Sequence, residues 1–132
     1  ADHHLPEKPN GLHDRVKAVY ELAARHEETL ARRFTDFVTT KPGIRLIGPQ
    51  SGDYGVRVPT FSFVVDGKRS GDICDALLAH KVGLSHGHFY ARRLVEAVGI
   101  GESEDGVVRA SMAHYTSEAD VDRLIESLDR VV

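Results

Sequence analysis

Three groups of polar side chains in this sequence could take part in chemistry. Residues 85–91 (Ser-His-Gly-His-Phe-Tyr-Ala) combine several proton donors and acceptors where a predicted strand leads into a predicted helix. Arg109 and Ser111 share one face of the next predicted strand, and residues 114–116 (His-Tyr-Thr) precede the last predicted helix. Backbone N–H groups at strand-to-helix junctions attract anions, and a nearby arginine could bind a carboxylate through two parallel hydrogen bonds. Spacing alone leaves the function of these candidates open.

Each candidate also has a purely structural interpretation. An arginine on a strand face is more often a solvated or ion-paired surface group than a substrate ligand, so both interpretations apply to Arg109. His86 and His88, joined by His80 or His114, could offer imidazoles to a metal ion. Their loose spacing gives no clear third ligand, and we therefore predict no metal site.

Two further side chains, Tyr90 and Cys74, are expected to serve in packing. Tyr90 falls at the start of a predicted helix, which fits a half-buried packing residue. Cys74 lies one helical turn before Leu77 and Leu78, which predicts a small core residue and not a nucleophile. Because it is the chain's single cysteine, an internal disulfide is excluded, and a reducing, cytoplasmic location is expected.

Composition restricts the class of protein without indicating a reaction. The chain has 132 residues, of which 41% are hydrophobic and 28% charged, as expected for one compact domain. A formal net charge of -3 predicts no general attraction to nucleic acid or to anionic membranes. No apolar run is long enough to span a membrane, and the first residues do not resemble a signal peptide.

Helical and strand patterns alternate along the chain and predict a small α/β domain, with a sheet of about four strands covered by helices. We interpret residues 1–11 as a loose lead-in and residues 12–132 as a single domain. The predicted helices are residues 12–40, 70–81, 89–98 and 117 onward, and the predicted strands are residues 44–48, 58–65, 83–86 and 107–113. Residues 99–106 are expected to form a flexible acidic stretch.

Side-chain periodicity assigns the faces of these elements. The long first helix should bury one apolar stripe, comprising Leu12, Val16, Val19, Ala23, Leu30, Phe34 and Phe37. Alternation in the two clearest strands predicts an apolar face comprising Phe61, Phe63, Val65, Val108, Ala110 and Met112. Arg109 is then on the opposite face. Because no strand precedes the long helix, we expect the chain to be part of a larger protein.

Local signals predict where the shorter helices begin and end. Ser70 is the expected N-cap of the second helix, with Ile73, Leu77 and Leu78 on its inner face and Lys81 in its last turn. Ser117 and Asp120 have the spacing of a capping box. The inner stripe of the last helix is predicted to comprise Val121, Leu124, Ile125 and Leu128.

Several stretches, in this order, resemble the C-terminal small domain of the cysteine desulfurase and class V aminotransferase enzymes. They are residues 26–30 (His-Glu-Glu-Thr-Leu), 42–48 (Pro-Gly-Ile-Arg-Leu-Ile-Gly), 57–63 (Arg-Val-Pro-Thr-Phe-Ser-Phe), 87–91 (Gly-His-Phe-Tyr-Ala), 108–111 (Val-Arg-Ala-Ser) and 114–124. The resemblance implies a larger, dimeric pyridoxal-phosphate (PLP) enzyme of fold type I. It implies that Arg109 binds the α-carboxylate of an amino-acid substrate and that His88 and Tyr90 lie in the substrate site.

The resemblance also implies what this chain lacks. The cofactor lysine of such enzymes belongs to a large domain that precedes this one, and no lysine here lies in a matching motif. We therefore expect no catalytic residue and no covalently bound PLP in this piece, and we expect it to be inactive alone. Cysteine desulfurases have Gly-His-His-Cys-Ala where this chain has Gly87 to Ala91, so Tyr90 replaces the sulfur-accepting cysteine. Transamination, racemisation and β-elimination remain open as reactions.

Two other classes of protein fit the residues. One is a free-standing α/β ligand-binding or regulatory module that shares only the architecture. The other is a small histidine-based metal protein. Exposed apolar surface on the first helix would favour the enzyme piece, whereas a fully covered helix with its own closed pocket would favour the free-standing module.

Overall fold

The computed structural model describes residues 11–101 and 103–132 and confirms a small α/β domain with a sheet of four strands. Its elements are α1 (Gly11–Thr40), β1 (Ile44–Ile47), β2 (Thr60–Val65), α2 (Ser70–Leu78), β3 (Ser85–Gly87), α3 (Arg92–Ala97), β4 (Val107–Ser111) and α4 (Glu118–Val131). The predicted lead-in lies outside the described residues except for Gly11, which is the first residue of α1. Within the described part of the chain, no helix is both long and apolar enough to cross a membrane.

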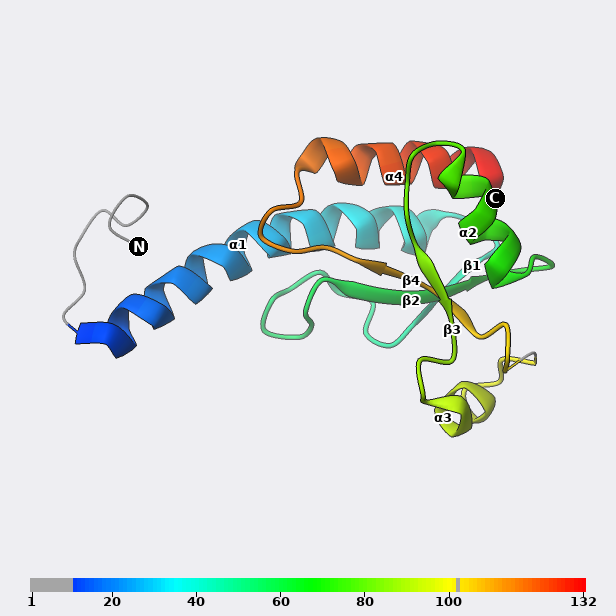
Figure 1. Cartoon of the computed structure of the whole chain (residues 1–132), viewed down its shortest axis with the longest axis horizontal. Coiled ribbons are helices and arrows are strands. Elements are labelled where there is room, and N and C mark those ends of the chain that lie inside the picture. The colour runs from blue at the N-terminus through cyan, green and yellow to red at the C-terminus, as the bar shows by residue number, and fades with distance from the viewer. Residues whose placement is uncertain (1–10, 102) are drawn as a thin grey trace.

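The sheet has the strand order β1-β2-β4-β3, and each neighbouring pair is antiparallel. Helices α1 and α4 lie on one face of the sheet, whereas α3 lies on the other (Figure 1). We call these the covered face and the open face. The register places Ser62 of β2 opposite Arg109 of β4, and Arg109 opposite Ser85 of β3. Arg109 is therefore central in a row that crosses three strands on the open face.

The core lies between the covered face and the helices. In β2 the buried residues are Phe61, Phe63 and Val65, as the alternation predicted. The ring of Phe34 from α1 packs edge-on against Phe61, with ring centroids 4.9 Å apart. Burial of each such aromatic side chain contributes about 1.5–3 kcal/mol to folding. In β4, Val108 and Ala110 complete the same layer.

Helix α1 is buried along only part of its length, which corrects the predicted continuous stripe. Its buried residues begin at Leu30 and continue through Phe34 to Val38. The outer half of α1, residues 11–25, extends beyond the sheet (Figure 1). Its large apolar side chains are exposed, with Leu12 79% and Tyr20 73% exposed. The prediction failed here because periodicity reports an apolar stripe but not what covers it.

The start of α2 differs from the prediction. Its N-cap is Arg69, and Ser70 is already helical and buried. The carboxylate of Asp105 accepts hydrogen bonds from the backbone N–H groups of Ser70 at 2.6 Å and Gly71 at 3.0 Å. The free N–H groups of this helix are thus satisfied from a loop that is distant in sequence, which a local capping pattern cannot indicate. The side chain of Asp105 is only 8% exposed.

Residues 99–106 were predicted to form a flexible stretch, but its last two residues, Asp105 and Gly106, are held in place by contacts with other elements. Gly106 is buried, and its φ of +65° is in the left-handed region. A Cβ atom at Gly106 would lie 2.1 Å from the carbonyl carbon of Gly87, so the two segments cross where no side chain fits. Asp105 and Gly106 therefore join this loop to α2 and β3.

The end of α2 also departs from expectation. The helix ends at Leu78, and Leu78 is 61% exposed instead of facing inward. Lys81 lies beyond the last turn in a left-handed conformation (φ 60°), so it does not sit in the last turn of the helix. Ile73 and Leu77, by contrast, are buried as predicted.

The last helix matches its sequence signals. Ser117 is the N-cap, and the capping box with Asp120 is complete. Hydrogen bonds from the side chain and then the backbone of Ser117 lower the pKa of the Asp120 carboxyl. Val121, Leu124 and Leu128 form the buried stripe. The capping box thus sets where α4 begins after β4.

Candidate functional site

The open face of the sheet brings polar side chains together in the middle of the domain. Antiparallel pairing sets Ser62, Arg109 and Ser85 side by side on β2, β4 and β3. Arg109 is half-buried, as its position on a central strand requires. The alternation of β4 directs its neighbours Val108 and Ala110 into the core, which leaves Arg109 facing away from it.

The Arg109 guanidinium lies over an aromatic ring. Its Cζ atom is 3.9 Å from the centroid of the Phe89 ring, which is a cation–π contact. Among the residues that the structure describes, the Arg109 side chain has no hydrogen-bond acceptor and no ion-pair partner. The N–H groups of the guanidinium therefore have no protein acceptor among the described residues, although the group contacts the Phe89 ring.

Phe89 belongs to a tight loop, residues 88–91, that precedes α3. The helix predicted from about Phe89 begins only at Arg92. Phe89 and Tyr90 both have left-handed backbones, with φ of 46° and 63°, and two such residues in a row cannot start a helix. The Ala91 N–H donates to the His88 carbonyl at 2.7 Å, and the Tyr90 N–H donates to His88 Nδ1 at 3.1 Å. The predicted helix extended into this loop because a side-chain pattern does not reveal a left-handed backbone.

The ring of Phe89 is anchored on the same side of the sheet as Arg109. It packs against a small apolar cluster whose buried members are Val95, Ile100 and Val107. This cluster fastens α3 and its flanking loops to the open face. Phe89 is therefore in contact with both the apolar support of α3 and the polar row of the sheet.

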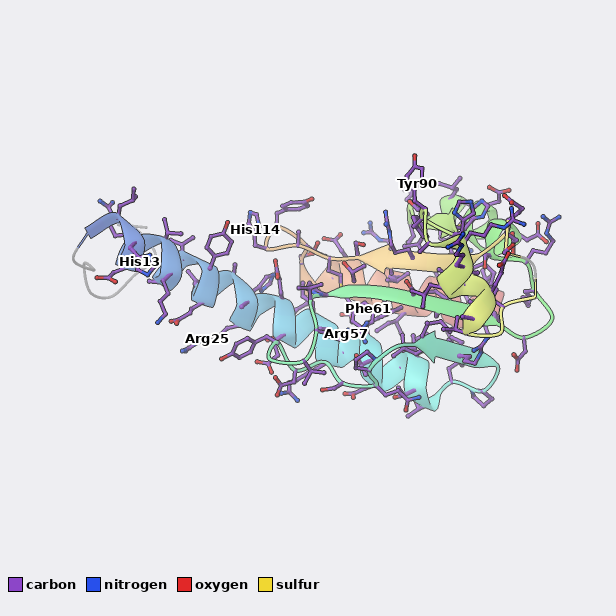
Figure 2. All side chains as sticks on the ribbon, turned by 90° about the horizontal axis from the view of Figure 1, so that it is seen from below. His13, Arg25, Arg57, Phe61, Tyr90 and His114 are labelled. Carbon is purple, nitrogen blue, oxygen red and sulfur yellow. The ribbon has the colours of Figure 1, made fainter. Side chains whose placement is uncertain are left out.

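The two other predicted site residues of the loop are placed differently. Tyr90 is fully exposed and projects outward from the domain (Figure 2), so its expected role in half-buried packing was wrong. The His88 side chain is one-third exposed, and its Nε2 atom is 3.9 Å from the Glu104 carboxylate. The structure thus joins Arg109 to the 88–91 loop through Phe89, a residue that the sequence analysis did not single out. In the sequence, Phe89 could have been noticed as an aromatic residue between the polar residues His88 and Tyr90.

The third candidate cluster, residues 114–116, does not join Arg109. His26 Nε2 of α1 donates to the Thr116 carbonyl at 2.8 Å, and His114 packs edge-on against Tyr115. His114 also lines a groove with apolar residues of the outer half of α1. In Figure 2, His114 and Tyr90 lie at separate places on the domain. Residues 114–116 therefore belong to the environment of α1.

Metal-ligating and nucleophilic side chains are dispersed. Within residues 11–101 and 103–132, no three histidine, cysteine, aspartate or glutamate side chains are close enough together to hold an ion. Cys74 is buried in the core as predicted. Burial, followed by the nearby charges of Asp75 and Asp105, raises the pKa of its thiol to about 11. The thiol is therefore neutral near pH 7.

The four lysines that the structure describes lie outside the sheet strands and outside the 88–91 loop. Lys41 Nζ donates to Asp129 at 2.7 Å, and Lys68 Nζ donates to the Val131 carbonyl at 2.6 Å, both toward α4. Lys17 lies in the outer half of α1, and Lys81 follows α2. No strand of the sheet and no residue of the 88–91 loop is a lysine.

The architecture is that of cysteine desulfurase structures. The cysteine desulfurase CsdA from Escherichia coli superimposes with a TM-score of 0.68 and 25% sequence identity, over 94% of this chain and 31% of that one. A cysteine desulfurase from Thermococcus onnurineus gives a TM-score of 0.74 at 23% identity, over 89% of this chain and 28% of that one, and shows the same fold. Both comparisons match a mixed α/β domain with a long first helix.

The chain belongs to the aminotransferase class-V family, whose model matches residues 16–124. An aminotransferase-like protein, FGM3, from Gibberella zeae is 39% identical over 88% of this chain and 29% of its own length. A cysteine desulfurase-like protein, ustD, from Aspergillus flavus is 28% identical over 86% of this chain and 26% of its own length. Enzymes of this family use PLP. The chain thus spans less than a third of these relatives, and the expected family is confirmed.

Proposed function

We propose that this chain is the C-terminal domain of a PLP-dependent enzyme that acts on an amino acid, with Arg109 binding the α-carboxylate. The observation that carries the proposal is the Arg109 guanidinium on the open face, with no acceptor among the described residues. A half-buried cation whose in-plane N–H groups lack a protein partner is suited to a carboxylate, which can accept two parallel hydrogen bonds from it. Family membership supplies the class of cofactor.

The 88–91 loop supports a reaction other than sulfur transfer to the enzyme's own cysteine. Tyr90 occupies the position that resembles the desulfurase cysteine, and a phenol cannot accept sulfur as a persulfide. The one cysteine of the chain, Cys74, is buried in the core with a raised pKa. We therefore assign His88 and Tyr90 to the rim of the substrate site. The reactions that fit are transamination, racemisation and β-elimination.

The outer half of α1 supports the proposed position in a larger protein. Leu12, Val16 and Val19 are all exposed, along one apolar stripe. In the proposed enzyme this stripe contacts the large domain that holds PLP, and the whole protein is a homodimer in the cytoplasm. Exposure of such a stripe is unfavourable for an independent module, so this observation favours the enzyme over a free-standing binding domain.

The first test is the visible absorbance of the full-length protein with bound PLP, before and after addition of individual L-amino acids, including cysteine. We expect a cofactor band that shifts with particular amino acids, which identifies the substrate class. A full-length protein that stays colourless with added PLP would contradict the enzyme assignment and favour the binding module.

The second test is Arg109→Ala in the same full-length enzyme. Loss of a charge-paired hydrogen bond to the carboxylate should weaken substrate binding by about 2–4 kcal/mol, or roughly 30- to 1000-fold in apparent KM. Arg93→Ala on α3 removes the same charge from an exposed helix position and should leave KM unchanged. An amine that lacks the carboxylate should be bound equally by the Arg109 variant and the unmodified enzyme. An unchanged KM for the amino acid would remove Arg109 from the site.

A further inference from the structure

We infer that Phe89 is a positioning residue for Arg109, and that their stacking couples the 88–91 loop to the binding of a substrate carboxylate. The inference rests on the proposed role of Arg109. It adds a residue to which the sequence motifs assign no separate role, and it gives the loop a physical connection to substrate binding.

The geometry leaves the binding edge of Arg109 free. A guanidinium is planar and directs its N–H groups outward in its own plane, whereas a cation–π contact uses the face of that plane. The Cζ atom of Arg109 lies 3.9 Å from the Phe89 centroid, and the guanidinium N–H groups have no hydrogen-bond acceptor among the described residues. A carboxylate can then approach the edge without displacing the ring. The ring also restricts the rotamers of a long side chain, so less conformational entropy is lost when the carboxylate binds.

The chain holds the ring at this place against a conformational cost. Phe89 has a left-handed backbone (φ 46°), which is unfavourable for a bulky residue that is not glycine. The favourable contacts are the apolar cluster of Val95, Ile100 and Val107 on one side and the guanidinium on the other. These two contacts offset the backbone strain. Removal of either the apolar contact or the guanidinium contact should therefore make the 88–91 loop more mobile.

The coupling is reciprocal. If Phe89 orders Arg109 for the carboxylate, then Arg109 must order the loop that carries Phe89 by the same free energy. Tyr90 follows Phe89 in the same loop and is fully exposed, so its place depends on the order of this loop and not on packing of its own side chain. The loop position that in desulfurases bears the cysteine is thus fixed here through the ring next to it.

The binding arm of the test uses the full-length PLP-loaded enzyme with L-alanine and ethylamine as probes, which differ by the carboxylate. Phe89→Leu keeps an apolar side chain but removes the π face, and it should raise the Kd for L-alanine about 3- to 30-fold. The Kd for ethylamine should not change. Phe89→Tyr restores an aromatic ring and should bring the Kd for L-alanine back to within about twofold of the unmodified enzyme. Leu94→Ala, an exposed apolar position on α3, is the matched control and should behave as unmodified.

The second arm needs no ligand and measures backbone hydrogen exchange in the 88–91 loop of the same full-length protein. The N–H groups of Tyr90 and Ala91 are both hydrogen-bonded to His88. Their exchange should be faster in Phe89→Leu and also in Arg109→Ala, and unchanged in Leu94→Ala.

The outcomes separate this inference from the proposed function. If Arg109→Ala weakens L-alanine binding but Phe89→Leu does not, the carboxylate role stands and the positioning role of Phe89 is overturned. If Arg109→Ala has no effect on L-alanine, the carboxylate role itself fails. Unchanged loop exchange in both variants would overturn the coupling even if L-alanine proved a poor ligand.

Discussion

The two faces of the sheet are built from the same strands but differ in the residues at their centre, where the open face carries the row Ser62, Arg109 and Ser85. On the covered face, Phe61 and Val108 are fully buried against the helices. One residue away along each strand, Ser62 and Arg109 face the open side and lie opposite each other. The comparison shows that alternation separates two tasks within the same strands. One register position is buried against the helices, and the next holds Arg109, whose guanidinium has no hydrogen-bond acceptor among the described residues.

The largest effect that tests this comparison comes from neighbouring residues on β2. Phe61→Ala should lower the free energy of unfolding by about 3–5 kcal/mol, because it removes a buried ring and leaves a cavity. Ser62→Ala on the open face should change it by no more than about 0.5 kcal/mol. Urea denaturation of the 132-residue chain measures both. Similar losses for the two variants would show that the open face is as important for folding as the covered face.

A smaller effect is expected where the loop before β4 caps α2. Asp105→Ala removes the acceptor of the Ser70 and Gly71 N–H groups and should cost about 1–2 kcal/mol of stability. Asp72→Ala removes an exposed carboxylate from the first turn of the same helix and should cost less than about 0.5 kcal/mol. Thermal or urea unfolding of both variants makes the comparison. If Asp72 mattered as much as Asp105, general helix electrostatics and not the cap would explain the effect.

The effect on stability that is smallest near neutral pH concerns the thiol on the covered side. Burial raises the pKa of Cys74 to about 11. The neutral thiol is therefore preferred in the folded state, and its contribution to stability is complete below the ordinary pKa near 9 and is lost as pH rises toward 11. Cys74→Ala should flatten the stability profile between these pH values. At pH 8, a thiol reagent should label native Cys74 on the order of 100-fold more slowly than the urea-unfolded chain. Rapid labelling of the native chain would show that the covered side opens readily.

The sequence predicted most of the fold because its strongest signals are local. Alternation in β2 and β4 assigned the two faces, and Ser117 with Asp120 located the start of α4. The resemblance placed Arg109 in the candidate site, and the structure puts it on the open face. These signals depend on residues two to four positions apart, which is the range over which side-chain patterns report backbone geometry.

What could not be predicted depends on contacts between distant segments or on backbone handedness. The Asp105 cap of α2 comes from a loop 35 residues away in sequence. The left-handed pair Phe89 and Tyr90 shortens α3, and only the folded chain shows Phe89 beneath Arg109. The exposure of Leu12 and its neighbours depends on which surface the rest of the fold covers, so the apolar pattern alone could not reveal it.

The continuity of α1 has a further geometric consequence. The helix runs for 30 residues, about 45 Å, and it is unbroken from its outer half to the part that packs on the sheet. An unbroken helix acts as a rod, so the angle about its axis between the outer apolar stripe and the sheet is set by residue count alone. Insertion of one residue between the two halves would rotate one against the other by about 100°. A domain that binds the outer stripe therefore has one fixed orientation about the helix axis relative to Arg109.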